Sequence, residues 1–116
     1  MKILIADKLS PKAIATLNKI GAEITSNPDL KAEELSDAIG NANVLIVRST
    51  IVFSETIEAG KSLELIIRAG AGVNNIDLEK ASSSGVYVAN CPGKNSDAVA
   101  ELTLGHIIAC DRRIVD

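Results

Sequence analysis

Short aliphatic runs alternate with segments of helical spacing along the whole chain. The five runs are Ile3–Ala6, Ala22–Ser26, Val44–Val47, Leu63–Ile67 and Val86–Ala89. Runs of this length, bounded by turn residues and lacking polar alternation, are typical of strands that are buried on both faces of a parallel sheet. The pattern therefore predicts five parallel strands.

Between these runs, apolar residues recur at the three- and four-residue spacing of a helix. The predicted helices span Pro11–Ile20, Asp29 or Leu30 to Ile39, Ser54 to Gly60, and Ile76–Ser83. Strands that alternate with helices through short connections indicate right-handed βαβ crossovers and an α/β fold. We expect a flavodoxin-like, five-stranded parallel sheet with helices on both faces and the strand order 2-1-3-4-5.

A longer helix, Ala98–Val115, is predicted after the fifth run, with Ser96 or Asp97 at its start. Its apolar residues do not share one face: Val99, Leu102, Leu104, Ile107, Ile108 and Ile114. A helix that is apolar on several sides needs several neighbours, and a five-stranded unit does not supply them. We expect residues 1–97 to form one domain and residues 98–116 to link it to polypeptide that is missing after Asp116, or to a second copy in a homo-oligomer.

Two arginines end neighbouring strands in the expected order, since Arg48 follows the third run and Arg68 follows the fourth. Ligands of parallel α/β sheets bind at the carboxyl ends of the strands. Guanidinium groups bind carboxylates and phosphates through paired hydrogen bonds. The sequence therefore predicts a site for a small anionic ligand at this edge.

Further polar or backbone donors follow the same strands. Ser49 lies beside Arg48, the turn Gly70-Ala71-Gly72 follows Arg68 and leads toward a helix, and Asn95 and Ser96 follow the fifth run. Consecutive N–H groups in a glycine turn form a nest that binds anions. The complete predicted substrate site is Arg48, Ser49, Arg68, Gly70, Ala71, Gly72, Asn95 and Ser96.

We assign no catalytic residue and no metal ligand from the sequence. The turn at Gly70 is not a dinucleotide fingerprint, because the third glycine of that motif would fall on Asn75. His106 is the only histidine and lies in the last helix without an orienting partner. Cys91 has no candidate base beside it, and no His, Cys and Asp residues have metal-ligand spacing.

Composition narrows the classes of function. With 47% hydrophobic residues, 23% charged residues and a net charge of −3, the chain gives no electrostatic reason to expect nucleic acid or a membrane surface. No apolar stretch approaches the roughly 20 residues of a membrane span. Two cysteines without a CxxC pair fit a reduced, cytoplasmic protein.

Alternative flavodoxin-like classes fit the strand ends less well. A phosphoacceptor receiver needs carboxylates after the first and third strands to hold magnesium, and this chain has Asp7 but then Arg48. A flavin carrier needs a phosphate loop after the first strand and aromatic residues to stack on the ring. A stand-alone module that binds or senses a small anion stays open.

Four stretches of the sequence resemble the D-2-hydroxyacid dehydrogenases, and the resemblance extends over essentially the whole chain. They are Val47-Arg48-Ser49-Thr50, the segment from Arg68 to Asp77, the segment from Asn90 to Ser96, and Val99-Ala100-Glu101-Leu102-Thr103. Arg68 ahead of the glycines is similar to the D-3-phosphoglycerate dehydrogenases of this family rather than to its lactate, formate or glyoxylate members.

This resemblance implies a two-domain enzyme in which a long helix joins a substrate domain to a nucleotide-binding domain. Such an enzyme oxidises the 2-hydroxyl of 3-phosphoglycerate by hydride transfer to NAD and so opens serine biosynthesis. The resemblance implies that Arg48 and Arg68 hold the anionic groups of the substrate, while the backbone of residues 70–73 faces its carboxylate. Asn95 and Ser96 would line the cleft.

For the cofactor, the resemblance implies that Ala71 and Val99 contact the nicotinamide end of NAD. The family's catalytic His, its Glu partner, a further Arg and the GxGxxG loop are expected in polypeptide that this sequence does not contain. His106 does not match the catalytic His. We therefore expect the segment alone to bind NAD weakly or not at all and to show no turnover.

Overall fold

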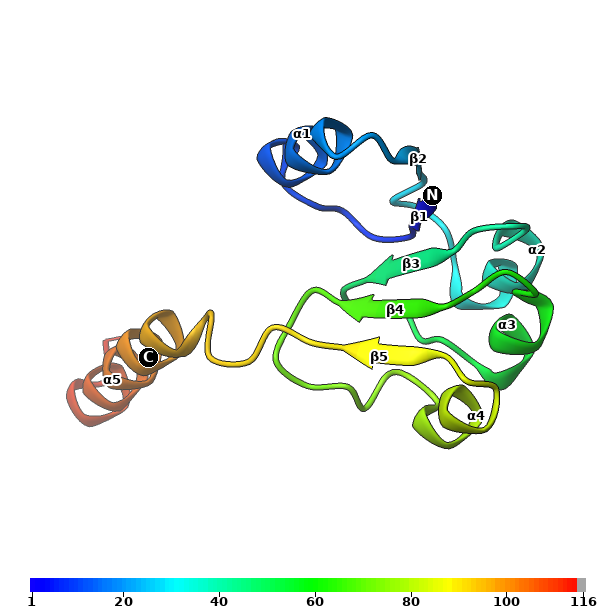
Figure 1. The fold of residues 1–116 in the computed structure, drawn as a ribbon. Coiled ribbons are helices and arrows are strands. Elements are labelled where there is room, and N and C mark those ends of the chain that lie inside the picture. Colours follow the sequence, from blue (N-terminus) through cyan, green and yellow to red (C-terminus); the bar gives the residue numbers. More distant parts are fainter. Residues whose placement is uncertain (115–116) are drawn as a thin grey trace.

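Five strands, the inner three of them aliphatic on both faces, form the centre of the computed structural model, which describes residues 1–114. They are β1 (Lys2–Ile5), β2 (Glu23–Ser26), β3 (Val44–Val47), β4 (Leu65–Arg68) and β5 (Tyr87–Ala89). All neighbours pair in parallel, in the order β2-β1-β3-β4-β5 (Figure 1). The predicted flavodoxin-like strand order is confirmed.

The helices lie on both faces of the sheet because the connections run in opposite directions from its middle. They are α1 (Pro11–Lys19), α2 (Leu35–Ala38), α3 (Ser54–Ala59), α4 (Leu78–Ser83) and α5 (Ser96–Arg112), with a 3-10 turn, η1 (Ala32–Glu34), before α2. The step from β1 to β2 moves one way, and the later steps move the other way. Since parallel crossovers are right-handed, α1 covers one face, and α2, α3 and α4 cover the other.

Each face of the sheet builds its own apolar cluster. Leu45, Val47 and Ile66 are fully buried against the α2, α3 and α4 side. Ile3, Ile5, Val44 and Ile46 pack on the opposite side, against Ile14 and Leu17 of α1. This second face is covered incompletely, because Tyr87, the register partner of Leu65, is 78% exposed.

The second predicted helix was placed too early. The structure begins it with η1 at Ala32, whereas the spacing predicted a start at Asp29 or Leu30. The N–H of Leu30 donates to the carbonyl of Asn27 in a turn, so the backbone there is not helical. The N–H of Lys31 then donates to the Glu34 carboxylate at 3.0 Å, which caps the turn that follows.

The fourth predicted helix also begins later than expected, at Leu78 rather than Ile76. Ile76 pairs with Val52 in an isolated parallel bridge, so its backbone is extended. The Asp77 carboxylate accepts the N–H of Lys80 at 2.9 Å and is the N-cap of α4. Gly85, at φ +71°, lies just beyond the C-terminal end of α4, where a residue with a side chain would be strained.

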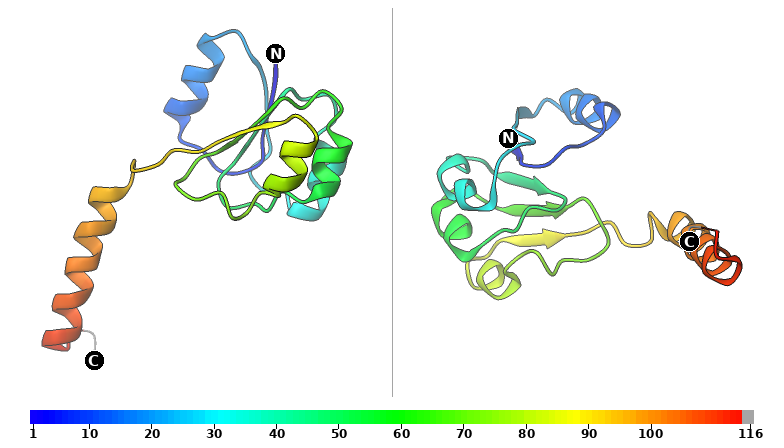
Figure 2. Two further views of the ribbon diagram at one scale, coloured as in Figure 1. Left: turned by 60° about the horizontal axis from the view of Figure 1, so that its bottom comes forward. Right: turned by 180° about the vertical axis from the view of Figure 1, so that it is seen from behind.

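The last helix stands apart from the sheet. α5 begins at Ser96 and contacts no other element among residues 1–114 (Figure 2). It ends before Arg113, which is left-handed at φ 47°, while the last predicted positions, Val115 and Asp116, lie outside the described residues. All six of its predicted apolar side chains are more than half exposed.

Matched isoleucine truncations test where the stability resides. Ile66→Ala removes a fully buried side chain and is expected to lower the free energy of unfolding by about 2–5 kcal/mol. Ile20→Ala, at a side chain that is 62% exposed, should change it by less than about 0.5 kcal/mol. Urea unfolding followed by circular dichroism measures both, and equal effects would contradict the assigned core.

Candidate functional site

The carboxyl ends of β1 and β3 flank the point in the sheet at which the direction of successive crossover connections reverses. Crevices at such points are the usual ligand sites of open α/β sheets. Here, a side chain of the protein itself occupies the crevice. Asp7, directly after β1, reaches across to the segment that follows β3.

Three successive backbone N–H groups converge on the Asp7 carboxylate. Those of residues 48–50 all donate to Oδ2 of Asp7, at 2.6, 3.0 and 3.0 Å. Partial burial acts to raise the pKa of Asp7, but the hydrogen bonds from these amides outweigh it and hold the pKa below its ordinary value. The carboxylate is therefore ionised and acts as an internal anion in a backbone nest.

Arg68 joins the same segment from the side of β4. Its Nε donates to the carbonyl oxygen of Arg48 at 2.8 Å, so the two predicted arginines lie on adjacent strand ends and touch. The guanidinium lies over Gly70, where a Cβ would overlap its Cζ and Nη1 atoms. Gly70 thus allows the close approach of the Arg68 guanidinium, and its φ is not positive.

Further hydrogen bonds join the strand-end loops into one surface. Asn75 Nδ2 donates to the carbonyl of Thr50 at 2.9 Å, and Asn90 Nδ2 donates to that of Ala71 at 2.6 Å. The N–H of Cys91 donates to the carbonyl of Gly70 at 2.8 Å. The loops after β3, β4 and β5 therefore hold one another in place.

Within residues 1–114, several groups in these loops keep donor capacity that no protein acceptor uses. Neither Arg48 nor Arg68 forms an ion pair within residues 1–114. The N–H groups of Ala71 and Gly72 donate to no acceptor in that part of the chain. We call Arg48, Ser49, Arg68, Ala71 and Gly72 the strand-end rim. It presents two positive charges and free amides, which is the chemistry that binds a small anion.

The turn at residues 70–72 differs from the prediction in two respects. The N–H of Gly70 is already used, since it donates to the carbonyl of Arg68 at 2.8 Å. The glycine turn does not open a helix, because α4 begins only at Leu78 and its start is capped by Asp77. The turn therefore gains nothing from a helix N-terminus.

The predicted residues beyond β5 do not join the rim. Asn95 and Ser96 lie where the chain enters α5, and Val99 lies in the first turns of that helix. No hydrogen bond links these three residues to the loops after β3 and β4 within the described chain. Figure 1 shows why, because the segment after β5 runs away from the sheet.

Sequence reasoning missed the most strongly bound group of the site. Asp7 was considered only as a possible magnesium ligand, yet it organises the loop after β3. The signal was an acidic residue directly after the first strand of a flavodoxin-like sheet. A magnesium site would need a second carboxylate after the third strand, where this chain has Arg48 instead. Asn75 and Asn90, which tie the loops together, had no sequence signal beyond their position between strands.

Other candidate chemistry in the molecule is weaker. His106 is exposed on α5, and Cys91 is half-buried without a neighbouring base. Among residues 1–114, no three His, Cys, Asp or Glu side chains could share a metal ion. No helix in that range combines the length and apolar character needed to cross a bilayer.

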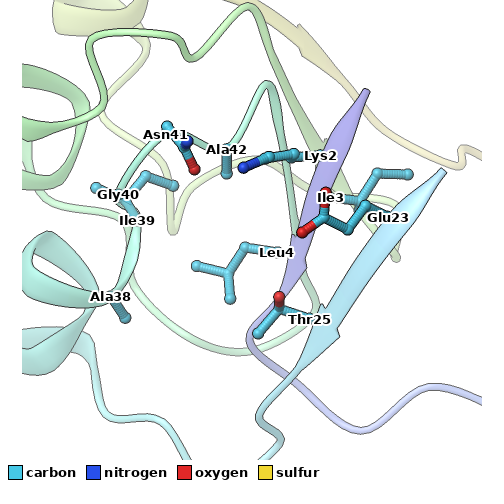
Figure 3. A pocket seen from close by; sticks show the side chains of 10 residues that line it. All are labelled: Lys2, Ile3, Leu4, Glu23, Thr25, Ala38, Ile39, Gly40, Asn41 and Ala42. Atoms are coloured by element: carbon cyan, nitrogen blue, oxygen red, sulfur yellow. The ribbon is translucent and has the colours of Figure 1, made fainter.

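A separate pocket of about 120 Å³ lies toward the amino-terminal ends of β1 and β2 (Figure 3). Its lining includes Lys2, Glu23 and Asn41 and otherwise consists mainly of aliphatic residues and backbone. This is the opposite edge of the sheet from Asp7 and the rim. The pocket therefore does not extend the anion site.

Comparison with known proteins identifies the family. The model of the D-isomer specific 2-hydroxyacid dehydrogenase catalytic domain matches residues 3–109. The chain belongs to this family. A hydroxypyruvate reductase of Thermotoga maritima is 44% identical over 115 residues, which cover 97% of this chain and 37% of that protein. A D-3-phosphoglycerate dehydrogenase of Methanocaldococcus jannaschii is also 44% identical, over 98% of this chain and 22% of its own length.

The fold of this 2-hydroxyacid dehydrogenase domain agrees with that of a solved relative. The NAD⁺-bound 3-phosphoglycerate dehydrogenase of Entamoeba histolytica superposes with a TM-score of 0.84 at 35% identity, over 94% of this chain and 38% of that one. The chain therefore spans well under half the length of these relatives.

Two glycine substitutions separate the packing role of Gly70 from general flexibility. Gly70→Ala is expected to displace the Arg68 guanidinium and break its hydrogen bond to the Arg48 carbonyl. The free energy of unfolding should change by less than about 1 kcal/mol, because the guanidinium lies at the end of a flexible side chain that can move. The Arg68 Nε–H signal in NMR should then exchange faster. Gly105→Ala, with open space around it, should leave that signal unchanged. An unaltered Arg68 signal in Gly70→Ala would contradict the assigned packing.

The depressed pKa of Asp7 gives a signed pH dependence. The pKa of an Asp side chain in an unfolded chain is about 3.9. The stabilisation by Asp7 is therefore complete above that pH, and it is lost as the pH falls through the lower folded-state pKa. Asp7→Asn should lower the free energy of unfolding at pH 7 by about 1–2 kcal/mol. This value is at the low end of what hydrogen bonds to a charged group contribute, because Asp7 is partly exposed to solvent. Urea unfolding at pH 7 and pH 3 measures the difference, which should shrink at pH 3. A difference that grows in acid would refute the assignment.

Proposed function

We propose that this chain is the substrate-binding part of an NAD-dependent oxidoreductase that acts on a small phosphorylated 2-hydroxy acid, 3-phosphoglycerate. The observation that carries the proposal is the strand-end rim, where Arg48 and Arg68 form no ion pair within residues 1–114 and the Arg68 guanidinium lies next to the turn that bears the free amides of Ala71 and Gly72. Family membership supports oxidation at the 2-hydroxyl, which would give 3-phosphohydroxypyruvate. The proposal includes that the whole enzyme is cytoplasmic and acts in serine biosynthesis.

The rim suits a ligand with two anionic ends. Arg68 has used Nε on the backbone, which leaves its two Nη groups for a carboxylate or phosphate. Arg48 is exposed, and the Ser49 hydroxyl beside it forms no hydrogen bond within residues 1–114. Two guanidinium groups and two amides provide enough donors for both anionic groups of 3-phosphoglycerate. Asn95 and Ser96 would reach the ligand only if the segment after β5 closed over the rim.

The cofactor requires residues that this chain does not supply. The glycine turn at residues 70–72 does not open a helix, because α4 begins at Leu78, and the side chains of Ala71 and Val99 offer only apolar contact to a nicotinamide edge. When bound, NAD would accept the hydride from the carbon that bears the 2-hydroxyl. We infer that a nucleotide-binding domain, reached through residues 98–116, provides the second wall of the site, and that this chain alone binds NAD weakly and is inactive.

α5 supports a second part of the proposal, which concerns assembly. Its apolar residues are exposed on several sides of the helix, and it has no packing partner among the described residues. Exposed aliphatic surface of this extent favours association. We propose that α5 packs both against the nucleotide-binding domain and in a homo-oligomer.

Two other substrates or roles compete with 3-phosphoglycerate. The Thermotoga relative, named a hydroxypyruvate reductase, is as similar to this chain as the phosphoglycerate dehydrogenase from Methanocaldococcus. A ligand without phosphate would need only one of the two arginines. A stand-alone module that binds a small anion would use the same rim without any redox reaction.

Titration of the chain with 3-phosphoglycerate and with D-glycerate, followed by amide chemical shifts in NMR, tests the proposal. We expect 3-phosphoglycerate to bind more tightly than D-glycerate and to shift the signals of Ala71 and Gly72. Arg48→Gln and Arg68→Gln should each weaken binding at least about 10-fold, because each removes a charge-assisted contact. Arg112→Gln on α5 is the matched control and should not change it.

Equal affinity for the two ligands would favour the unphosphorylated substrate. Binding that survives both rim substitutions would contradict the proposed site.

A further inference from the structure

The segment after β3 is held mainly through its backbone, and the Thr50 side chain adds a hydrogen bond to Asp7. All three N–H groups of residues 48–50 are taken up by one oxygen of Asp7. The carbonyl of Arg48 accepts from Arg68 Nε, and the carbonyl of Thr50 accepts from Asn75 Nδ2. Nearly every backbone polar group of this segment therefore has a fixed partner, and the side chains of Arg48 and Ser49 remain to meet a ligand.

Asp7 has a particular position among these partners. It follows β1, whereas Arg68 and Asn75 come from the opposite side of β3, so the segment is held from both sides. Asp7 is also the only one of the three that carries a negative charge. Three amides that converge on one point form a nest which, without Asp7, would attract an anionic ligand.

We propose that Asp7 is a positioning residue for substrate binding: its carboxylate fills the nest in the crevice between β1 and β3, fixes the backbone from which Arg48 extends, and confines the anionic ligand to the β3–β4 side. This inference rests on the proposed function, because it assigns Asp7 a role in the same site. Asp7 does not touch the substrate. It acts through the 48–50 segment.

The charge of Asp7 explains why an amide would not replace it. A carboxylate oxygen accepts several N–H donors, and its bonds to them are stronger than those of a neutral group. In Asp7→Asn, the nest would face a weaker acceptor and an amide N–H₂ that repels its donors. The segment would loosen, and the vacated amides would compete with the rim for the ligand.

A double-mutant cycle tests this role. Dissociation constants for 3-phosphoglycerate are measured by NMR for the wild-type chain, Asp7→Asn, Arg48→Gln and the double variant. Asp7→Asn should weaken binding about 10-fold, as misplacement of a binding group does, but should have little further effect once Arg48 is replaced. Asp37→Asn, at an exposed carboxylate on α2, is the matched control and should bind like the wild type. Equal losses in both backgrounds, or no loss at all, would overturn the proposal.

A second measurement needs no substitution and covers the case in which Asp7→Asn does not fold. In an acid titration of the wild-type chain, the amide signals of residues 48–50 should move together, with one midpoint below the ordinary value for Asp. Lys8, Arg48 and Arg68 are the charged groups on the neighbouring strand ends. Amides that titrate separately or not at all would show that Asp7 does not hold the segment.

The two measurements also separate this inference from the proposed function. A wild-type chain that shows the shared titration but binds no 3-phosphoglycerate would refute the proposed substrate, and with it the assigned role in binding. A chain that binds 3-phosphoglycerate through the rim without the shared titration would refute only the role of Asp7.

Discussion

The bond between the Asp7 carboxylate and the amides of residues 48–50 is the constraint on which the rest of the site depends. A parallel sheet ends in backbone donors that no further strand satisfies, and these donors must find partners. In this chain an internal carboxylate meets that need at the central crevice. As a result, the loop after β3 has one conformation, and Arg68 can place its Nε on the Arg48 carbonyl.

The direction of the crossovers determines where the open surfaces lie. The reversal between β1 and β3 places a single helix, α1, on one face and three helices on the other. The face with α1 stays partly open near Tyr87, and α5 extends away rather than covering it. Both features leave apolar surface exposed among residues 1–114. The rim itself is polar and charged, so it suits a ligand rather than a protein core.

Much of the fold was predictable because the aliphatic runs and the helix-ending glycines are local signals. The alternation of strands and helices did not fix the strand order, but it favoured the flavodoxin-like order that the structure has, and the predicted adjacency of Arg48 and Arg68 rested on that order. Helix starts were less predictable. At Ile76, pairing with Val52 overrode a helical pattern, and no local signal shows such a tertiary contact.

The details of the site depended on contacts between distant segments. The hydrogen bonds of Asp7 span more than 40 positions along the chain, and the sequence does not show that three amides point toward one carboxylate. Similarly, the GxG turn predicted free backbone donors, but not that the first of its N–H groups would bond to the Arg68 carbonyl. Residue type and strand ends located the rim. Hydrogen bonds within the folded loops determine which donors of the rim remain free within residues 1–114.

A crystal structure of the chain with bound 3-phosphoglycerate would test the central claim most directly. We expect the anionic groups of the ligand to lie within hydrogen-bond distance of the Arg48 and Arg68 guanidinium groups, with the Asp7 carboxylate still bonded to residues 48–50. A ligand that lies between β1 and β3 and displaces Asp7, or that binds away from both arginines, would contradict it.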